Sequence, residues 1–218
     1  MARMIIDADL SNVRVNGPWQ RRQAEELERF KNAETAVVGD TLNHLTTMSG
    51  RIRRLVGEGT LVGSAFPISV QPGDNLGVWR ALDDAQAGDV LVINARGANG
   101  AAILGGQLGK MMAKVGVLGA IVDGPVRDLD DLDDLDGYGL HIYATGKTAM
   151  GPSKFGPAEV GFPVACDSAV VHPGDIIVAD RDGVAVVPQL RIDEVLTAIH
   201  QKEADEEQLL ARIDTEWR

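Results

Sequence analysis

Two adjacent residues of opposite charge, Arg127 and Asp128, follow an apolar segment and a Gly-Pro pair. Residues 120–122 are typical of a short buried strand, Asp123-Gly124-Pro125 of its turn, and the charged pair of a helix start, where the dipole favours negative charge. The Asp128 carboxylate is a hard oxygen ligand for Mg2+ or Mn2+, and the Arg127 guanidinium offers a planar fork of donors to a carboxylate or an enolate oxygen. An ordinary helix-start aspartate beside a solvated arginine is the alternative interpretation.

A glycine-dense segment, Gly100 to Lys110, precedes this pair and predicts a turn that enters a helix. Backbone amides at a helix N-terminus can bind a carboxylate or a phosphate without any side chain, because the unsatisfied N–H groups and the dipole point the same way. The same glycines can instead serve tight turns and close packing. The segment lacks the G-x-G-x-x-G pattern, and Arg96 to Gly100 lacks the ending of a P-loop, which disfavours dinucleotide and nucleotide binding.

In combination, these segments resemble a known family. The family comprises proteins similar to the regulator of ribonuclease E activity A, the RraA-like proteins, and includes the class II 4-hydroxy-4-methyl-2-oxoglutarate aldolases. The resemblance covers most of the chain, and the motifs occur in the family's order. The matching segments are VGDTL at 38–42, PGDNL at 72–76, AGDVLVI at 87–93, GAIVDGPVRD at 119–128, HPGDIIVAD at 172–180 and DGVAVVP at 182–188.

The resemblance implies a role for each matching residue. Asp128 would hold the divalent metal, Mg2+ or Mn2+, together with several waters, and Arg127 would contact the oxo or enolate oxygen of the substrate. Glu203, in the C-terminal helix, would reach the metal waters of a neighbouring subunit; a solvated helix face is its alternative. The pyruvyl carboxylate would bind the turn formed by Gly105, Gly106, Gln107 and Leu108.

The implied activity is a lyase of small 2-oxo acids that gives pyruvate through a metal-stabilised enolate. The reaction would be oxaloacetate decarboxylation, aldol cleavage of 4-hydroxy-4-methyl-2-oxoglutarate-type substrates, or both. Relatives with aldolase activity tend to carry an acid at the position of Gly106, which is thought to hold the water that removes the hydroxyl proton. Because decarboxylation needs no such base, Gly106 favours decarboxylation without excluding aldol cleavage, and Gln107 could orient a water.

Composition sets bounds on the fold and the partners. The 218 residues, 44% of them hydrophobic, suffice for one substantial core, so we expect a single domain over 1–218. The net charge of −11 argues against nucleic acid as a partner. A lone cysteine, Cys166, fits a reducing cytoplasm and a role as a small apolar filler. We see no signal peptide or long apolar span, which predicts a soluble cytoplasmic protein without membrane contact.

The chain shows a mixed α/β pattern. We expect a charged amphipathic helix over 17–33 and a long helix over 190–216. The resemblance implies a single-domain αββα sandwich with a central β core that assembles as a homotrimer or homohexamer. Between the end helices we expect helices near 40–48, 76–86 and 104–115, and strands over 60–66, 89–94, 119–123, 140–144, 175–180 and 183–188, the last two forming a hairpin.

A function of a different class is a non-enzymatic regulator that binds another protein, a ribonuclease in the case that named the family. An acidic surface could engage an arginine-rich tail. That function has no use for Arg127 and Asp128 beside an amide-lined turn. A methyltransferase is disfavoured, because no glycine-rich nucleotide loop follows a first strand. We interpret Lys147 and Lys154 as solvated loop residues rather than Schiff-base formers.

Overall fold

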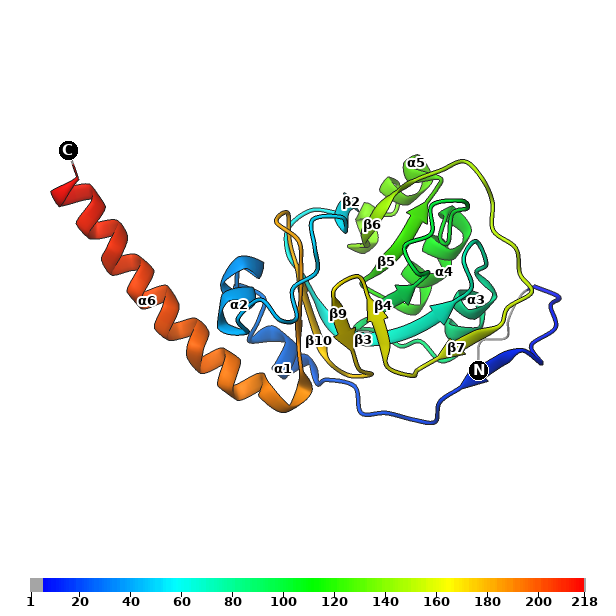
Figure 1. Ribbon diagram of the computed structural model, residues 1–218, viewed down its shortest axis with the longest axis horizontal. Helices are drawn as coiled ribbons and strands as arrows, with labels where there is room; N and C mark the ends of the chain where they lie inside the picture. Colours follow the sequence, from blue (N-terminus) through cyan, green and yellow to red (C-terminus); the bar gives the residue numbers. More distant parts are fainter. Residues whose placement is uncertain (1–5, 218) are drawn as a thin grey trace.

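Four parallel strands form the centre of the main sheet. In the computed structural model, which describes residues 6–217, β3 (Leu61–Val70), β4 (Asp89–Asn94), β5 (Gly119–Val126) and β6 (His141–Lys147) lie in that order (Figure 1). Shorter strands extend both edges: β7 (Ala158–Val160) and β1 (Val13–Val15) beyond β3, and β2 (Arg53–Val56) beyond β6. The central strands are almost entirely buried, as expected for parallel strands that are covered on both faces.

The two faces of this sheet pack against different layers. Because successive side chains of a strand point to opposite faces, Leu91 and Ile93 of β4 pack towards the helices α3 (Leu76–Ala81) and α4 (Gly106–Val115), whereas Val90 and Val92 pack towards a second β layer. That layer contains the predicted hairpin, β10 (Ile176–Ala179) with β11 (Val184–Val187), and the pair β8 (Val164–Cys166) and β9 (Ala169–Val171). Cys166 is buried there, as predicted, and burial raises the pKa of its thiol.

A third apolar cluster covers the outer face of the β10–β11 hairpin. It joins that face to α1 (Ala24–Glu28), α2 (Thr35–Thr41) and the first half of α6 (Ile192–Glu216), which follows the 3-10 turn η2 (Gln189–Arg191). The order of layers is therefore helix, sheet, sheet, helix. The predicted mixed α/β single-domain sandwich with a long C-terminal helix is confirmed.

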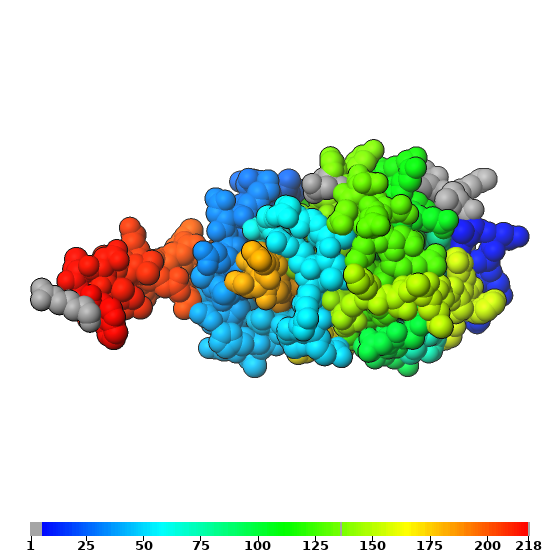
Figure 2. Space-filling model, turned by 90° about the horizontal axis from the view of Figure 1, so that it is seen from above, coloured from blue at the N-terminus to red at the C-terminus, as the bar shows by residue number. Residues whose placement is uncertain are grey.

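The C-terminal part of α6 projects from the body of the protein (Figures 1 and 2). The buried positions of α6 end at Ile199, and residues beyond it include the exposed apolar side chains of Leu209, Leu210 and Ile213. In the described part of the chain, no helix is both long and apolar enough to cross a membrane.

The predicted N-terminal helix over 17–33 is wrong in extent, because α1 covers only Ala24–Glu28. The preceding segment lies extended and is fixed by tertiary contacts. Arg21 Nε donates to the Asp89 carboxylate at 2.8 and 3.0 Å, and its guanidinium stacks 4.8 Å from the Trp19 ring. Trp19 in turn packs 4.6 Å from the ring of Phe66. A buried ion pair and aromatic contacts outweigh helix propensity here.

Other element boundaries also differ from the predictions. Asp123-Gly124-Pro125 is not a turn: β5 continues to Val126, and its register with β6 shifts between Val122 and Pro125. α2 precedes the predicted 40–48 helix, because the left-handed backbone of Asn43 and His44 ends it early. α3 ends at Ala81 rather than 86, and the short strands β1, β2, β7 and β9 were not predicted.

Loss of the Arg21 guanidinium should destabilise the protein in a pH-dependent way. Asp89 is fully buried, and removing one partner of a buried pair typically costs about 3–5 kcal/mol. Burial raises the pKa of Asp89 and Arg21 opposes that rise, so Arg21→Ala raises it further. The loss in the free energy of unfolding should therefore be large at pH 7. It should shrink as the pH falls through the raised pKa of Asp89, because a protonated carboxyl needs no counter-charge.

Urea unfolding of Arg21→Ala at pH 7 and near pH 4.5 tests this expectation. Arg14→Ala is the matched control, since the Arg14–Glu159 pair is exposed and should contribute at most about 1 kcal/mol. Equal stability losses in the two variants would contradict a structural role for the buried pair.

Candidate active site

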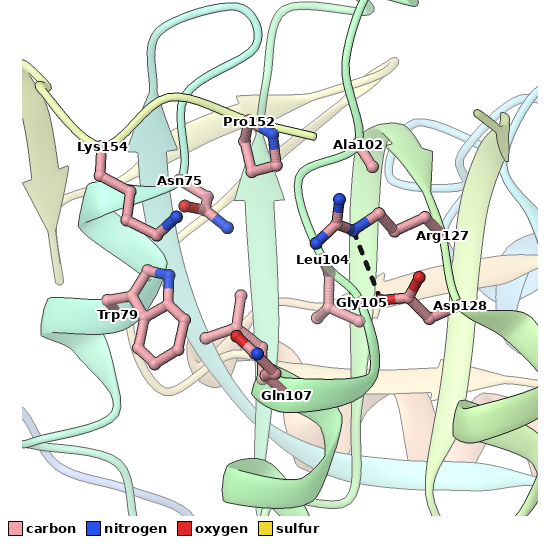
Figure 3. A pocket seen from close by; sticks show the side chains of 11 residues that line it. Asn75, Trp79, Ala102, Leu104, Gly105, Gln107, Arg127, Asp128, Pro152 and Lys154 are labelled. Carbon is pink, nitrogen blue, oxygen red and sulfur yellow. Dashed lines mark ion pairs between the residues drawn. The ribbon is translucent and has the colours of Figure 1, made fainter. Parts of the chain in front are cut away.

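The candidate site lies where three loops leave the carboxyl ends of parallel strands. Asn75 is the N-cap of α3 after β3, Gly105 is the N-cap of α4 after β4, and Asp128 is the N-cap of α5 (Leu129–Asp133) after β5. Because parallel strands end at the same edge of a sheet, these residues meet there although they are distant in sequence. Figure 3 shows them around one pocket.

Backbone hydrogen bonds hold the loop before α4 against the end of β5. The Ile103 N–H donates to the Pro125 carbonyl at 2.8 Å, and the Arg127 N–H donates to the Leu104 carbonyl at 3.0 Å. Leu104 and Val126 also form an isolated parallel bridge. The start of α4 is therefore fixed beside the charged pair. The glycine-dense segment predicted the turn and the helix start, whereas their position beside Arg127 and Asp128 comes from these contacts.

The backbone of Asp128 turns its carboxylate back over the start of α4. The residue is left-handed, with φ 55° and ψ 46°, a conformation that aspartate tolerates better than most residues. Its Oδ2 accepts the Gly106 N–H at 3.2 Å and lies 3.4 Å from Arg127 Nε. A Cβ on Gly105 would stand 2.6 Å from this oxygen, so a larger residue there would displace the Asp128 carboxylate.

The charged pair is accessible to a ligand. The side chains of Arg127 and Asp128 are 37% and 38% exposed, so their mutual attraction contributes little to stability. They form one wall of a small pocket that is partly open to solvent, so a ligand could reach both side chains from solution.

Most of the predicted site residues meet in this pocket. Its lining includes Gly105, Gln107, Leu108, Arg127 and Asp128. Gly106 lies at its edge, in an adjoining groove that also contains Gln107. Glu203 does not line the pocket: it lies on the exposed part of α6, 3.7 Å from His200 of the same helix. A contribution of Glu203 to such a site would have to come from another copy of the chain.

The opposite wall contains residues that were not selected from the sequence. Asn75 and Trp79 lie four positions apart, at the start of α3, and each is only 4% exposed. Lys154 is exposed, as predicted, yet its side chain lines the same wall (Figure 3). The i, i+4 spacing of Asn75 and Trp79 places them on one helix face, but the sequence alone did not indicate what that face contacts.

Asp74 anchors the loop that carries Lys154. Its carboxylate accepts hydrogen bonds from Ser153 Oγ and the Phe155 N–H at 2.7 Å each, and from the Leu76 N–H at 2.9 Å. Burial raises the pKa of Asp74, but these hydrogen bonds outweigh burial and hold it below its ordinary value. The position of Lys154 therefore depends on an ionised Asp74.

Another acidic side chain, Asp131, occupies the space beside Gly106. A Cβ on Gly106 would lie 2.8 Å from Asp131 Oδ2. Asp131 follows Asp128 by three positions, and the two carboxylates lie against the adjacent glycines Gly105 and Gly106. A carboxylate thus stands next to position 106 even though the residue there is glycine. The R-D-x-x-D spacing was the signal in the sequence.

The carboxylates of Asp128 and Asp131 suit a hard divalent cation that takes only a few of its ligands from the protein. Within the described residues, no group of three or more His, Cys, Asp and Glu side chains is arranged to hold a metal ion. Asp128 and Asp131 are exposed carboxylates against adjacent glycines of the α4 turn. Mg2+ is commonly bound by one or two carboxylates, with waters and substrate oxygens completing its shell, so these residues fit such an ion.

Comparisons with known proteins identify the family of this chain. The family model described as RraA-like, Aldolase/RraA, matches residues 35–186. A protein of Halalkalibacterium halodurans provisionally named 4-hydroxy-4-methyl-2-oxoglutarate aldolase is 34% identical over 83% of this chain and 85% of its own. A 4-hydroxy-4-methyl-2-oxoglutarate aldolase of Thermus thermophilus is 34% identical over 53% of this chain and 69% of its own.

A solved structure of a related protein has the same fold as this chain. RraAS2 of Streptomyces coelicolor, described as an unusual member of the RNase ES inhibitor RraA protein family, is 28% identical. It superposes with a TM-score of 0.76 over 87% of this chain and 98% of its own. Because the family model spans most of the sequence and the fold and relatives agree with it, this chain belongs to the RraA-like family.

Proposed function

We propose that this protein is a divalent-metal-dependent lyase of small 2-oxo acids that yields pyruvate. Its reactions would be aldol cleavage of 4-hydroxy-4-methyl-2-oxoglutarate-type substrates, decarboxylation of oxaloacetate, or both. One observation carries the proposal: the Arg127–Asp128 pair lies in one pocket with the N-terminal amides of α4. The names of the aldolase relatives support the lyase chemistry.

The start of α4 provides the binding point for the C1 carboxylate of the substrate. The first N–H groups of a helix have no intrahelical acceptor, and Asp128 binds only that of Gly106. The amides of Gln107 and Leu108 are therefore the donors for a ligand carboxylate, and the dipole of the ten-residue helix favours the negative charge. Arg127 lies beside them and would donate to the C2 oxo oxygen.

Arg127 stabilises the charge that develops during cleavage. When the C3–C4 bond breaks, its electron pair passes to the C2 oxygen as an enolate, and a proton then adds to C3 to give pyruvate. In decarboxylation the C4 carboxylate leaves as CO2; in aldol cleavage the C4 hydroxyl loses its proton and C4 becomes a carbonyl. Mg2+ or Mn2+ held by Asp128 and Asp131 would supply Lewis-acid stabilisation of the same charge.

Asp131 is the candidate for the base that aldol cleavage requires. Its carboxylate lies beside Gly106, where relatives with aldolase activity tend to carry an acid, and could accept the C4 hydroxyl proton through a water. If Asp131 supplies this base, the glycine at position 106 no longer favours decarboxylation over aldol cleavage. Both reactions remain open to this site.

A homotrimer or homohexamer would complete the site. Glu203 lies on the exposed stretch of α6 and does not line its own pocket, so a neighbouring subunit is where it could reach metal waters. Exposed apolar side chains further along α6, such as Leu209 and Ile213, favour burial against another copy.

A protein-binding regulator is the second candidate function. The net charge of −11 and the RNase inhibitor family named for the Streptomyces coelicolor structure favour it. Binding to an arginine-rich segment would depend on surface acids and would be unaffected by Arg127→Ala. The two functions can thus be separated by variants.

Arg127→Ala should abolish metal-dependent exchange of the pyruvate methyl hydrogens in deuterated buffer, measured by proton NMR. Loss of one preorganised donor to an enolate oxygen typically costs about 100- to 1,000-fold in rate. EDTA should have the same effect, whereas Arg181→Ala, in the exposed turn between β10 and β11, should behave as the wild type. Absence of exchange in the wild type with metal bound would overturn the proposed lyase function.

Asp131→Asn should slow aldol cleavage of 4-hydroxy-4-methyl-2-oxoglutarate by about 100-fold or more, because general-base catalysis typically contributes about 100- to 10,000-fold. Oxaloacetate decarboxylation should slow less, since it removes no hydroxyl proton. The matched control is Asp130→Asn, which changes the adjacent exposed carboxylate of α5. Equal rates in the two variants at saturating Mg2+ would remove Asp131 from the mechanism.

Mixing two inactive variants tests whether subunits share a site. Glu203→Gln should lower kcat without unfolding the protein, and Glu207→Gln, on the same exposed stretch of α6, should not. Refolding Arg127→Ala together with Glu203→Gln should restore part of the activity, because some mixed sites then contain both native residues. Full activity of Glu203→Gln alone would contradict this role.

A further inference from the structure

The wall opposite Arg127 contains two buried polar atoms that lack a protein partner. Within the described residues, Asn75 Oδ1 and Trp79 Nε1 form no hydrogen bond, although both residues are 4% exposed and line the pocket. Buried donors and acceptors are nearly always paired, and unpaired ones in a pocket point to a ligand or a water. Neither atom has a role in the proposed bond cleavage.

The chemistry of the two atoms is complementary. Asn75 Nδ2 donates to the Ile103 carbonyl at 3.0 Å, which fixes the amide so that Oδ1 remains as an acceptor. The indole Nε1 of Trp79 can only donate. In Figure 3 the ends of both side chains converge with the ammonium of Lys154, across the pocket from Arg127 and Asp128.

One functional group satisfies an adjacent donor and acceptor together: a hydroxyl, whose oxygen accepts from the indole and whose hydrogen is donated to the amide. We propose that Asn75 and Trp79 are specificity residues that bind the C4 hydroxyl of a 4-hydroxy-2-oxo acid, while Lys154 binds the carboxylate on the same carbon. This inference rests on the proposed lyase function. It makes the hydroxylated substrate preferred over oxaloacetate, which leaves Asn75 Oδ1 without a donor.

The preference follows from the cost of burial. A site built to hydrogen-bond a substrate hydroxyl discriminates strongly against an analogue that lacks it, because the buried partners are then left unpaired. Lys154 contributes differently: as an exposed cation it attracts any second carboxylate. The two walls thus divide the substrate between them, with the 2-oxo carboxylate at α4 and the hydroxylated end at α3. For aldol cleavage the hydroxyl hydrogen turns from Asn75 Oδ1 to the water through which Asp131 accepts the proton.

Trp79→Phe tests the inference, because it removes one N–H group and keeps an aromatic ring of similar size. The ratio of kcat/KM for 4-hydroxy-4-methyl-2-oxoglutarate to kcat/KM for oxaloacetate should fall about tenfold or more, mainly through KM. Lys154→Met should lower kcat/KM for both substrates and leave that ratio nearly constant. Trp19→Phe is the matched control, since its indole Nε1 is also buried without a partner but lies outside the pocket.

A binding readout without turnover complements the kinetics. In the 15N–1H spectrum of EDTA-treated protein, the indole signal absent from Trp79→Phe belongs to Trp79. This signal should move downfield with 4-hydroxy-4-methyl-2-oxoglutarate and stay in place with pyruvate. An unmoved signal together with an unchanged ratio would overturn the inference and assign the two atoms to bound water. Wild-type exchange of pyruvate hydrogens separates this failure from failure of the lyase function itself.

Discussion

The backbone pairing between the loop before α4 and the end of β5 is the contact on which the site depends. The bridge between Leu104 and Val126, continued by the hydrogen bond from the Arg127 N–H to the Leu104 carbonyl, sets the α4 amides beside the charged pair. Without it, the helix start proposed to bind the substrate carboxylate and the arginine proposed to stabilise the enolate would be separate features. Fixed donors of this kind need no reorganisation when charge develops, which is why such arrangements favour catalysis.

Buried carboxylates connect the loops and the N-terminal segment to the helices and strands of the core. Asp74 joins the loop carrying Lys154 to the start of α3, and Asp89 joins the extended N-terminal segment to the start of β4. Asp175 accepts hydrogen bonds from the N–H groups of His172 and Gln189 before and after the β10–β11 hairpin. Each of these three aspartates follows a glycine in a turn just before a helix or a strand. The same Gly-Asp pair in the sequence thus makes three of the long-range connections.

The relatives of this chain include proteins named as aldolases, and a structure with the same fold belongs to a family named for inhibition of a ribonuclease. A fold therefore does not decide between these functions; the side chains at the α4 turn do. In this chain the turn has both its glycines, the left-handed aspartate and the adjacent arginine, and the pocket continues to a polar wall on α3. These features are costly or unnecessary for a protein whose function lies only on its surface.

The sequence by itself determined the apolar strands, the glycine-dense helix start, the hairpin at 175–188 and the position of Arg127 and Asp128 between a buried strand and a helix, because these depend on local patterns and motifs. Only the tertiary structure decided which distant residues face that pair. Asn75, Trp79 and Lys154 reach it through strand order and a loop anchored by Asp74, and Asp131 fills the space that Gly106 leaves. The extended segment before α1 shows the same limit: its charge pattern favours a helix, but the contacts of Arg21 and Trp19 with the core are long-range, and long-range contacts leave no local signal.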